Sequence, residues 1–303
     1  MSNKVMIVGT GNVGASYAYA LVNQRTAVNE LVLVDINADN AEGQAIDLRD
    51  ALVVAPGYMK ISSGTYADAG DADIIVITAG APQKPGETRM DLLQKNAAIF
   101  KDMVGQIMAS GFDGIFVVVS NPMDVLTYLT YRYSGLPAER VIGSGTVLDS
   151  GRLRHRLARR LGMHPGSVHA YQVGEHGDSE FALWSSAYVG GQRVTDLISG
   201  EELDEIEDYA RKVAYEIIEK KGATFYGIGA CLVMITNCIL GDENRVLPVS
   251  SYDEFSDTYN GFPAILGRYG VVKRMALEMN DKEMEKFGAS VAALKEAIES
   301  VTQ

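Results

Sequence analysis

The feature that most constrains this chain is a glycine-rich turn at residues 9–14, which reads Gly-Thr-Gly-Asn-Val-Gly. The turn directly follows a short apolar run at residues 5–8 and opens an amphipathic stretch at residues 13–23. Glycines in this G-x-G-x-x-G spacing let a strand turn tightly into a helix, and they leave the N–H groups at the helix N-terminus open to an anion. The string alone is weak evidence, because glycine-rich turns also occur as plain structural loops.

An acidic residue at the expected distance strengthens this interpretation. Asp35 ends the next apolar run, at residues 31–34, and lies 21 positions after Gly14. An acid at this spacing accepts hydrogen bonds from an adenosine ribose, and its charge would repel a 2′-phosphate. The sequence therefore predicts an NAD site rather than an NADP site, in which Gly9, Gly11 and Gly14 surround the pyrophosphate.

Short apolar runs alternate with amphipathic stretches through the first half of the chain. Further runs at residues 74–78 and 115–119 flank a helical pattern at about 92–109. Strands that are apolar throughout are typical of a parallel sheet covered by helices on both faces. The sequence predicts an α/β fold that begins with a Rossmann-type, doubly wound parallel sheet.

The pattern changes after about residue 162. Antiparallel strands are expected at 168–173 and in a hairpin around Gly190-Gly191 (186–189 and 192–194). Further strands are expected near 245–250 and 262–270, and helices at about 200–221, 224–239 and 281–300. We therefore expect a mixed α+β substrate domain at residues 149–303. It follows a dinucleotide-binding domain at residues 1–148 that includes a lid loop at about 80–91, and the boundary is soft between about 145 and 160.

Charge and cysteine content exclude several classes of partner. The 27 basic and 39 acidic residues give a net charge of −12, which repels a phosphate backbone, so nucleic acid is not expected as a partner. Cys231 and Cys238 lie in an apolar stretch and favour buried thiols over a disulfide or zinc site, and no metal site is predicted. Residues 222–241 carry no charge, but glycines, threonines and an asparagine interrupt them, so a buried helix is expected rather than a membrane span. With no cationic leader at the N-terminus, a cytoplasmic location is expected.

The loop at residues 80–89 leaves the C-terminal end of the 74–78 run, where ligands bind in open α/β sheets. Its two prolines between glycines suit a lid, and a solvated surface loop is the alternative. Asp149 and Arg152 are three positions apart, so both side chains would leave one helix face and Arg152 could bind a carboxylate. The alternative for this pair is an exposed ion pair on a helix surface.

His176 lies in a turn after a strand, within Gly-Glu-His-Gly-Asp-Ser at residues 174–179. A lone histidine is more often an ordinary core or surface residue. Together with a dinucleotide turn, an arginine-bearing lid and an aspartate that could hold the imidazole in one tautomer, it becomes a candidate general acid/base.

Four strings stand in the order seen in one known family: Ala-Gly-Ala-Pro-Gln-Lys-Pro-Gly-Glu-Thr-Arg at 79–89, Ser-Asn-Pro-Met-Asp at 120–124, Leu-Asp-Ser-Gly-Arg at 148–152 and the histidine string at 174–179. With them the chain resembles, from about residue 4 to 300, the bacterial-type L-lactate dehydrogenases of the lactate/malate dehydrogenase family. The first apolar run begins within a few residues of Met1, which matches bacterial rather than vertebrate relatives.

The resemblance implies NAD-dependent interconversion of pyruvate and L-lactate. His176 would be the general acid/base, Asp149 its orienting partner, Arg152 the clamp for the substrate carboxylate, and Arg89 on the lid would polarise the carbonyl. Gln83, Asn121 and Thr224 are implied as substrate contacts, and the neutral Gln83 argues against malate, because malate-specific relatives carry arginine there. Cofactor contacts are implied for Val13, Tyr66, Gly80, Ala81, Asn121 and Ser144.

Arg154 and His169 match positions at which some bacterial relatives bind fructose 1,6-bisphosphate between subunits. The resemblance thus also implies a homotetramer activated by this bisphosphate. The basic run at 152–160 suits an anion, although charge runs are more often solvated or ion-paired helix surfaces. Two alternatives stay open: another L-2-hydroxy-acid dehydrogenase, acting on malate or a branched 2-keto acid, and a non-catalytic NAD-binding protein.

Overall fold

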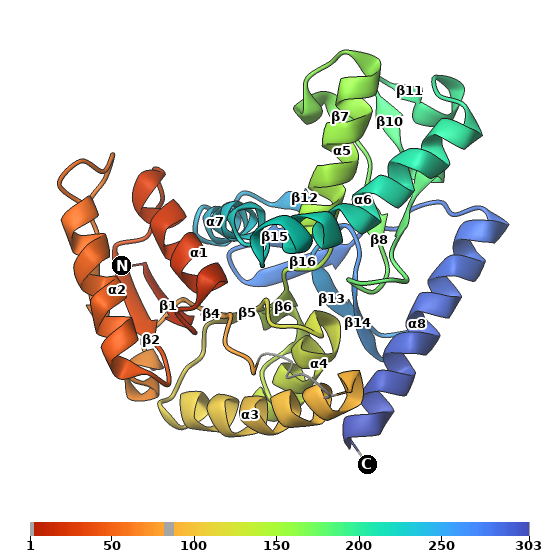
Figure 1. Ribbon diagram of the computed structural model, residues 1–303. Coiled ribbons are helices and arrows are strands. Elements are labelled where there is room, and N and C mark those ends of the chain that lie inside the picture. Colours follow the sequence, from red (N-terminus) through yellow and green to blue (C-terminus); the bar gives the residue numbers. More distant parts are fainter. Residues whose placement is uncertain (1–2, 82–87, 303) are drawn as a thin grey trace.

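The computed structural model describes residues 3–81 and 88–302. At its centre, an eight-stranded sheet has the strand order β14-β13-β6-β5-β4-β1-β2-β3 (Figure 1). Six strands run parallel: β1 (Lys4–Val8), β2 (Glu30–Val34), β3 (Lys60–Ser63), β4 (Ile74–Ile77), β5 (Ile115–Val118) and β6 (Val141–Gly143). The strand order reverses between β1 and β4, so the predicted doubly wound sheet is confirmed.

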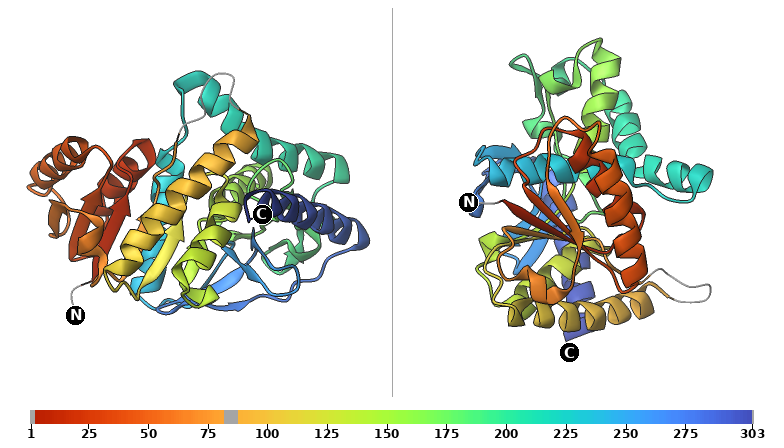
Figure 2. Two further views of the ribbon diagram at one scale, coloured as in Figure 1. Left: turned by 90° about the horizontal axis from the view of Figure 1, so that it is seen from below. Right: turned by 90° about the vertical axis from the view of Figure 1, so that its left-hand side faces the viewer.

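Helices cover both faces of the sheet because successive strand side chains point to opposite sides (Figures 1 and 2). Val5 and Ile7 of β1 pack in one core cluster with α1 (Asn12–Asn23), α2 (Ala38–Ala51) and α7 (Tyr226–Leu240). Met6 and Val8 pack in the opposite cluster with α3 (Arg89–Ala109), α4 (Met123–Ser134) and α8 (Asp281–Thr302). Each face is therefore closed by helices from both halves of the sequence.

The second half of the chain also contributes strands to the central sheet. β13 (Ser250–Asp253) pairs antiparallel with β6, and β14 (Thr258–Gly261) pairs with β13. β12 (Arg245–Leu247), β15 (Ala264–Gly267) and β16 (Gly270–Arg274) form a separate antiparallel sheet. The two strands expected near 245–250 and 262–270 were wrong in extent. The polar residues Ser251 and Asn260 interrupt the apolar pattern from which a buried strand is predicted. Both are nevertheless buried, because their side chains accept hydrogen bonds from the Arg274 guanidinium.

An outer layer with its own core contains α5 (Val147–Leu161), α6 (Gly200–Lys221) and a small sheet of β7 (Val168–His169), β10 (Tyr188–Val189) and β11 (Gln192–Arg193). The predicted hairpin around Gly190-Gly191 is confirmed as the β10–β11 pair, and both glycines have positive φ. The run expected at 168–173 is divided between β7 and β8 (Gln172–Val173), which pairs with β9 (Phe181–Ala182). Short 3-10 turns are η1 (Tyr66–Ala69), η2 (Ala138–Arg140), η3 (Pro165–Ser167), η4 (Trp184–Ser186) and η5 (Val194–Asp196).

Helix α7 carries most of the uncharged segment noted in the sequence, and it packs against α1. The Tyr17 and Thr236 hydroxyl oxygens are 2.5 Å apart in this buried contact. Both cysteines lie on α7 as free thiols, with Cys238 buried and Cys231 half-buried. Within the described residues, none of the helices has the length and apolar character that a membrane span requires.

Candidate active site

The glycine-rich turn lies beside β4, at the reversal of strand order. Gly9 has a φ of +98°, and a Cβ there would lie 2.5 Å from the backbone nitrogen of Ala79. A Cβ on Gly14 would lie 2.0 Å from the carbonyl oxygen of Gly9, which also accepts a hydrogen bond from the Thr78 hydroxyl at 2.6 Å. Glycine is therefore required at both positions for α1 to approach the loop after β4.

Gly11, in contrast, faces open space, since a Cβ there would have no heavy atom within 4 Å. Gly11 is the N-cap of α1, which has neither a side-chain cap nor an acidic residue in its first turn. The N–H groups of this turn are available to a ligand, and the positive end of the helix dipole is not neutralised. The turn fits an anionic group such as a phosphate.

Asp35 directly follows β2 and lies beside this turn. Its Oδ2 accepts hydrogen bonds from the Thr10 backbone N–H at 2.7 Å and from the Thr10 hydroxyl at 2.8 Å. Partial burial disfavours ionisation, but these hydrogen bonds hold the pKa of Asp35 below its usual value. Burial, with the charges of Asp102 and Asp35, raises the pKa of Tyr66 at the start of η1. An ionised carboxylate and a neutral phenol therefore lie near the turn.

A buried asparagine fixes the start of the predicted lid. Asn96 on α3 accepts a hydrogen bond from the Ala81 N–H at 2.8 Å and donates to the Asn121 carbonyl oxygen at 3.3 Å. Gly80 and Ala81 are thereby held beside the loop after β5, which includes the cis Asn121-Pro122 bond. The sequence had not singled out Asn96, whose partners are distant along the chain.

The rest of the predicted lid is described only in part. Gln83 lies outside the described residues. Arg89 is the first residue of α3, and its side chain also lies outside the described part. The roles expected for these two side chains stay predictions.

A cavity of about 280 Å³ lies between α1, α5, α6 and the start of α7. The structure brings together in its lining Val13, Asn121, Ser144, Asp149, Arg152, His176 and Thr224, all predicted from the sequence. Sequence reasoning missed other lining residues, namely Glu180 and, from α6, Arg211, Ala214, Tyr215 and Ile218. For the α6 residues the only signal was a spacing of three and four positions, which places them on one helix face.

Asp149 joins two of the cationic groups of this cavity, His176 and Arg152. Its Oδ2 lies 2.8 Å from Nδ1 of His176, and its Oδ1 accepts a hydrogen bond from Nη1 of Arg152 at 2.8 Å. The Asp149 side chain is only 3% exposed, whereas the imidazole keeps 30% exposure. Because Asp149 contacts Nδ1, the other imidazole nitrogen, Nε2, is the one available to a ligand.

A second carboxylate holds the backbone of His176. The His176 N–H donates to Oδ2 of Asp124 on α4 at 2.7 Å, and Oδ1 of Asp124 accepts a hydrogen bond from the Ser250 hydroxyl of β13 at 2.5 Å. Burial raises the pKa of Asp124 to about 6, although these hydrogen bonds oppose the shift. Asp124 belongs to the Ser-Asn-Pro-Met-Asp string, which was its only signal in the sequence.

The charge state of His176 follows from these neighbours. Desolvation in the cavity disfavours the imidazolium, but the Asp149 carboxylate, through its charge and its hydrogen bond, outweighs it and raises the pKa of His176 to about 10. Conversely, His176 and Arg152 lower the pKa of Asp149 despite its burial. At neutral pH the cavity therefore contains an imidazolium that can release a proton, beside a guanidinium that can attract a carboxylate.

Arg154 and His169 do not line this cavity. Arg154 is half-buried on α5, where its Nε donates to the Ser150 carbonyl oxygen at 3.2 Å and burial lowers its pKa. His169 is exposed on β7, which packs against α5, and it lies opposite Tyr188 of β10. The structure thus places both residues in the outer layer.

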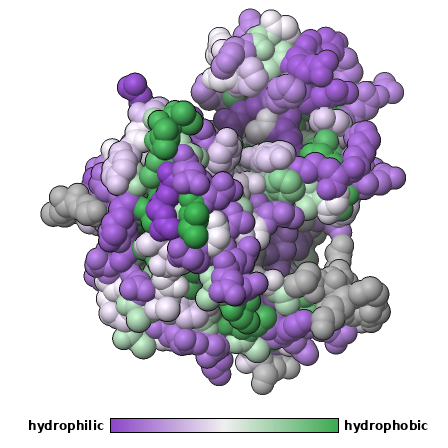
Figure 3. Space-filling view, turned by 60° about the vertical axis from the view of Figure 1, so that its left-hand side comes forward, coloured by the Kyte–Doolittle hydropathy of each residue, from purple (hydrophilic) through white to green (hydrophobic). Residues whose placement is uncertain are grey.

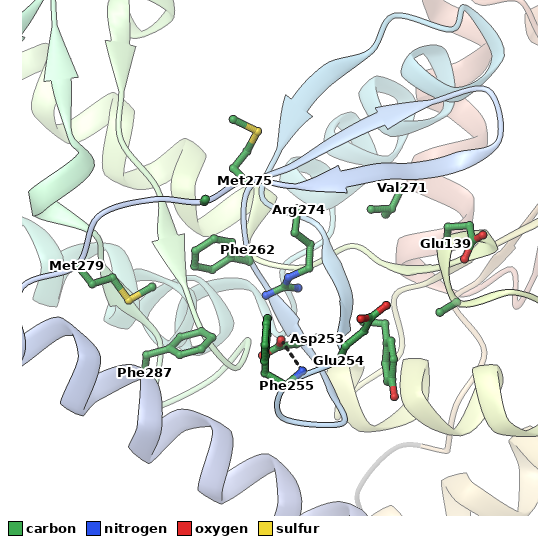
Figure 4. Close-up of a pocket in the computed structure, with 13 residues that line it drawn as sticks. Glu139, Asp253, Glu254, Phe255, Phe262, Val271, Arg274, Met275, Met279 and Phe287 are labelled. Carbon is green, nitrogen blue, oxygen red and sulfur yellow. Dashed lines mark hydrogen bonds between the residues drawn. The ribbon is translucent and has the colours of Figure 1, made fainter.

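A second cavity, of about 590 Å³, lies between the β13–β14 turn, β16 and α8 (Figure 4). The Arg274 guanidinium lies beside the Phe262 ring there, with its central carbon 5.0 Å from the ring centroid. Of the described residues that line this cavity, none was predicted as a site residue. The candidate chemistry is therefore located in the cavity around His176.

Two family models together match almost the whole chain. The NAD-binding domain of lactate/malate dehydrogenase matches residues 3–143, and the α/β C-terminal domain of the same enzymes matches residues 146–303. The chain belongs to the lactate/malate dehydrogenase family.

Individual relatives agree with this membership. L-lactate dehydrogenase 2 of Bacillus cereus is 52% identical over 309 residues, which cover 99% of this chain and 98% of that protein. The L-lactate dehydrogenase of Halalkalibacterium halodurans is 51% identical and covers 97% of this chain and 96% of its own length. Among solved structures, a lactate dehydrogenase from a Medee basin deep-sea metagenome library has a TM-score of 0.97 at 47% identity, with full coverage of both chains. The minor L-lactate dehydrogenase of Enterococcus mundtii with bound ligands has a TM-score of 0.95 at 46% identity, covering 99% and 98%.

The resemblance stated from the sequence is thereby confirmed, and this member of the lactate/malate dehydrogenase family is an NAD-dependent oxidoreductase. The residues present fit the cofactor. The uncapped N-terminus of α1 at Gly11 suits a pyrophosphate, and the ionised carboxylate of Asp35 can accept hydrogen bonds from a ribose.

Two alanine substitutions in the turn should separate folding from cofactor binding. Gly14→Ala forces a Cβ against the Gly9 carbonyl oxygen and should lower the free energy of unfolding by about 3 kcal/mol. Gly11→Ala meets no protein atom, so its stability should stay within about 0.5 kcal/mol of wild type. Its methyl group would enter the space expected for the pyrophosphate, so the Kd for NADH should rise about tenfold or more. Denaturant unfolding and NADH fluorescence titration measure the two effects, and unchanged NADH binding by Gly11→Ala would contradict this placement.

Proposed function

We propose that this chain is an NAD-dependent L-lactate dehydrogenase that interconverts pyruvate and L-lactate. The observation that carries the proposal is the pair of cations joined by Asp149, in which His176 offers a proton and Arg152 a guanidinium within one cavity. A 2-keto acid needs both groups, because its carbonyl oxygen takes up a proton on reduction and its carboxylate pairs with an arginine. The names of the relatives support this substrate.

In this proposal Gly9, Gly11, Gly14 and Asp35 hold NAD, with further contacts from Val13, Tyr66, Gly80, Ala81, Asn121 and Ser144. NAD, when bound there, would supply the hydride chemistry of the reaction. His176 donates its Nε2 proton to the carbonyl oxygen of pyruvate, and neutral His176 takes the hydroxyl proton of lactate in the reverse direction. Asp149 orients the imidazole and stabilises its charged form.

The remaining substrate contacts are assigned to the lid and to the cavity wall. Arg152 binds the substrate carboxylate, Asn121 and Thr224 line the pocket, and Arg89 polarises the carbonyl when the lid closes and excludes water. Gln83 meets the small methyl end of pyruvate. Residues 1–148, with the lid, then form the dinucleotide-binding domain, and residues 149–303 form the substrate domain.

An absorbance assay of NADH consumption tests the proposed substrate. Pyruvate should give a kcat/KM well above those of oxaloacetate and 2-ketoisocaproate, because a neutral residue at position 83 offers no partner to a second carboxylate. A higher kcat/KM for oxaloacetate would overturn the lactate assignment in favour of malate, and no turnover of any of the three would overturn the enzymatic role itself.

Replacing His176 by Asn should reduce kcat by about 10²- to 10⁴-fold, the usual contribution of general acid/base catalysis. NADH binding should change little, because the glycine turn and Asp35 are not altered. Pyruvate reduction by the wild type should also fall as pH rises through about 10, where His176 loses its proton. Asp149→Asn should move this fall to lower pH, since the carboxylate that stabilises the imidazolium is lost. Turnover by His176→Asn within a few-fold of wild type would contradict the assignment.

We also propose a cytoplasmic homotetramer that binds fructose 1,6-bisphosphate at Arg154 and His169. Within the described residues no carboxylate pairs with the half-buried Arg154 guanidinium, which suits an anionic ligand. Ile36, Val53, Val54 and Tyr58 are each more than 80% exposed, and Figure 3 shows apolar patches on the face that carries α1 and α2. Such patches favour association between subunits.

The bisphosphate should lower the KM for pyruvate, because two copies of each basic residue at a symmetry axis repel one another until an anion binds. Arg154→Gln combined with His169→Ala should abolish this response and keep the basal activity. Arg156→Gln is the control, since Arg156 is a basic residue of the same helix that stacks on Tyr209. A pyruvate saturation curve that saturating bisphosphate leaves unmoved would show that the wild type lacks this regulation.

A further inference from the structure

Glu180 is a buried carboxyl group that the mechanism above does not use. It lines the same cavity as His176, directly precedes β9 and has a side chain that is only 3% exposed. Its Oε2 lies 3.9 Å from Nδ1 of His176, the nitrogen that also contacts Asp149. One polar side-chain atom from each of the three residues lies within 4.8 Å of the others. Two carboxyl groups therefore share one imidazole.

The two carboxyl groups differ in their partners. Asp149 accepts hydrogen bonds from His176 and Arg152, whereas among residues 3–81 and 88–302 no hydrogen bond reaches the carboxyl group of Glu180. Burial and the negative charge of Asp149 raise the pKa of Glu180 well above its usual value, against the effects of His176, Arg152 and Arg211. A proton held on Glu180 relieves the repulsion between the two carboxyl groups.

The groups around Glu180 come from every side of the cavity. Asp149 and Arg152 belong to α5, while His176 and Asp178 belong to the loop that ends at Glu180; Asp178 accepts a hydrogen bond from Tyr215 of α6. Arg211 of α6 is paired with Asp208. Asp124 of α4 accepts a hydrogen bond from the His176 backbone N–H. Cys231 of α7 is a thiol, and burial raises its pKa to about 11.

The charge of the lining depends on the proton of Glu180. Besides Glu180, the charged lining residues are two carboxylates, Asp149 and Asp178, and three cations, Arg152, His176 and Arg211. The sum is one positive charge when Glu180 is protonated and zero when it is ionised. A single unscreened charge in such a cavity changes the affinity for an anion by about tenfold or more.

We propose that Glu180 is a positioning residue that keeps the cavity cationic for an anionic substrate, by holding a proton beside the Asp149–His176 pair. The inference rests on the proposed function in taking a 2-keto acid carboxylate as the ligand. Ionisation of Glu180 as pH rises weakens binding of that carboxylate, while His176 keeps its own proton and the chemical step proceeds. Glu180 therefore acts on KM rather than on kcat.

The test compares Glu180→Gln, a neutral side chain of the same size, with Glu207→Gln as the matched control. Glu207 is also a buried glutamate, but it is bonded to Trp184 and Lys286 outside the cavity. At saturating NADH, the KM of Glu180→Gln for pyruvate should change little between neutral and alkaline pH, because glutamine cannot ionise. At alkaline pH the wild-type KM should rise about tenfold above that of Glu180→Gln, and the control should follow the wild type.

Infrared difference spectra give a readout that does not depend on turnover. At neutral pH the carbonyl band of a protonated carboxylic acid should disappear in Glu180→Gln and persist in Glu207→Gln. If pyruvate is not turned over, the proposed function fails, and the infrared band alone still decides whether Glu180 holds a proton. Should Glu180→Gln not fold, Glu180→Ser offers the same comparisons with a smaller neutral side chain.

Three results would overturn the proposal. The first is a pair of KM profiles that run parallel over the whole pH range in wild type and Glu180→Gln. The second is a large loss of kcat in folded Glu180→Gln at pH 7, which would assign Glu180 to the chemical step. The third is an infrared spectrum in which Glu180→Gln retains every band of the wild type.

Discussion

The buried carboxylate of Asp149 is the interaction on which the rest of the site depends. An isolated carboxylate at this depth would cost several kcal/mol, and its two oxygens are instead used by two different cations. Arg152 is held three positions along the same helix, so α5 alone fixes that half of the pair. His176 comes from a loop, and the 2.8 Å contact to Asp149 fixes both the tautomer and the orientation of its imidazole. Removing Asp149 would leave two cations in the cavity without compensation, so the substrate site and the proton donor are energetically one unit.

A loop residue can be placed this well only because the central sheet holds the loop from both sides. Gly174 exchanges two backbone hydrogen bonds with Gly261, at 2.9 and 2.8 Å, and the His176 N–H is bound by Asp124 of α4. Gly261 ends β14, and Ser250, the other partner of Asp124, begins β13. The antiparallel pair that the second half of the chain adds to the sheet therefore does more than cover its edge. This strand pair fixes the position of His176 relative to the sheet, and β1 and β2 fix the position of the glycine turn. The cofactor site and the proton donor are therefore positioned by the same rigid sheet.

How much the sequence could predict depends on whether a residue's signal is local. The glycine turn, Asp35, the apolar strands and the long helices follow from spacing along a few tens of residues, and the family strings pointed to Asp149, Arg152 and His176. Asn96 and the structural role of Asp124 could not be found in this way, because both are buried polar residues whose hydrogen-bond partners are distant in the chain. Glu180 could not be found either, because nothing in its local spacing indicates that it is buried beside His176. The hydrogen bond from Ser250 to Asp124 spans 126 positions, for example. The same reason explains the region of β12 to β16, where Ser251 and Asn260 read as loop residues until Arg274 is placed against them.

The net charge of the chain argued against nucleic acid as a partner, but it did not predict the charge of the small-molecule ligands. A chain of charge −12 should repel anions at long range, yet the dinucleotide that this family binds carries a pyrophosphate, and the proposed substrate is a carboxylate. Salt screens exposed charges over about 8–10 Å, so most of the surface acids contribute little inside a cavity. What acts on the substrate is Arg152 together with the His176 imidazolium, two side chains partly withdrawn from water, where the effective dielectric constant is lower and each charge counts for more. What acts on the pyrophosphate is the unneutralised N-terminus of α1. The affinity for anions is thus set by the few cations in this cavity, and the acidic surface is left to keep the protein dispersed in water.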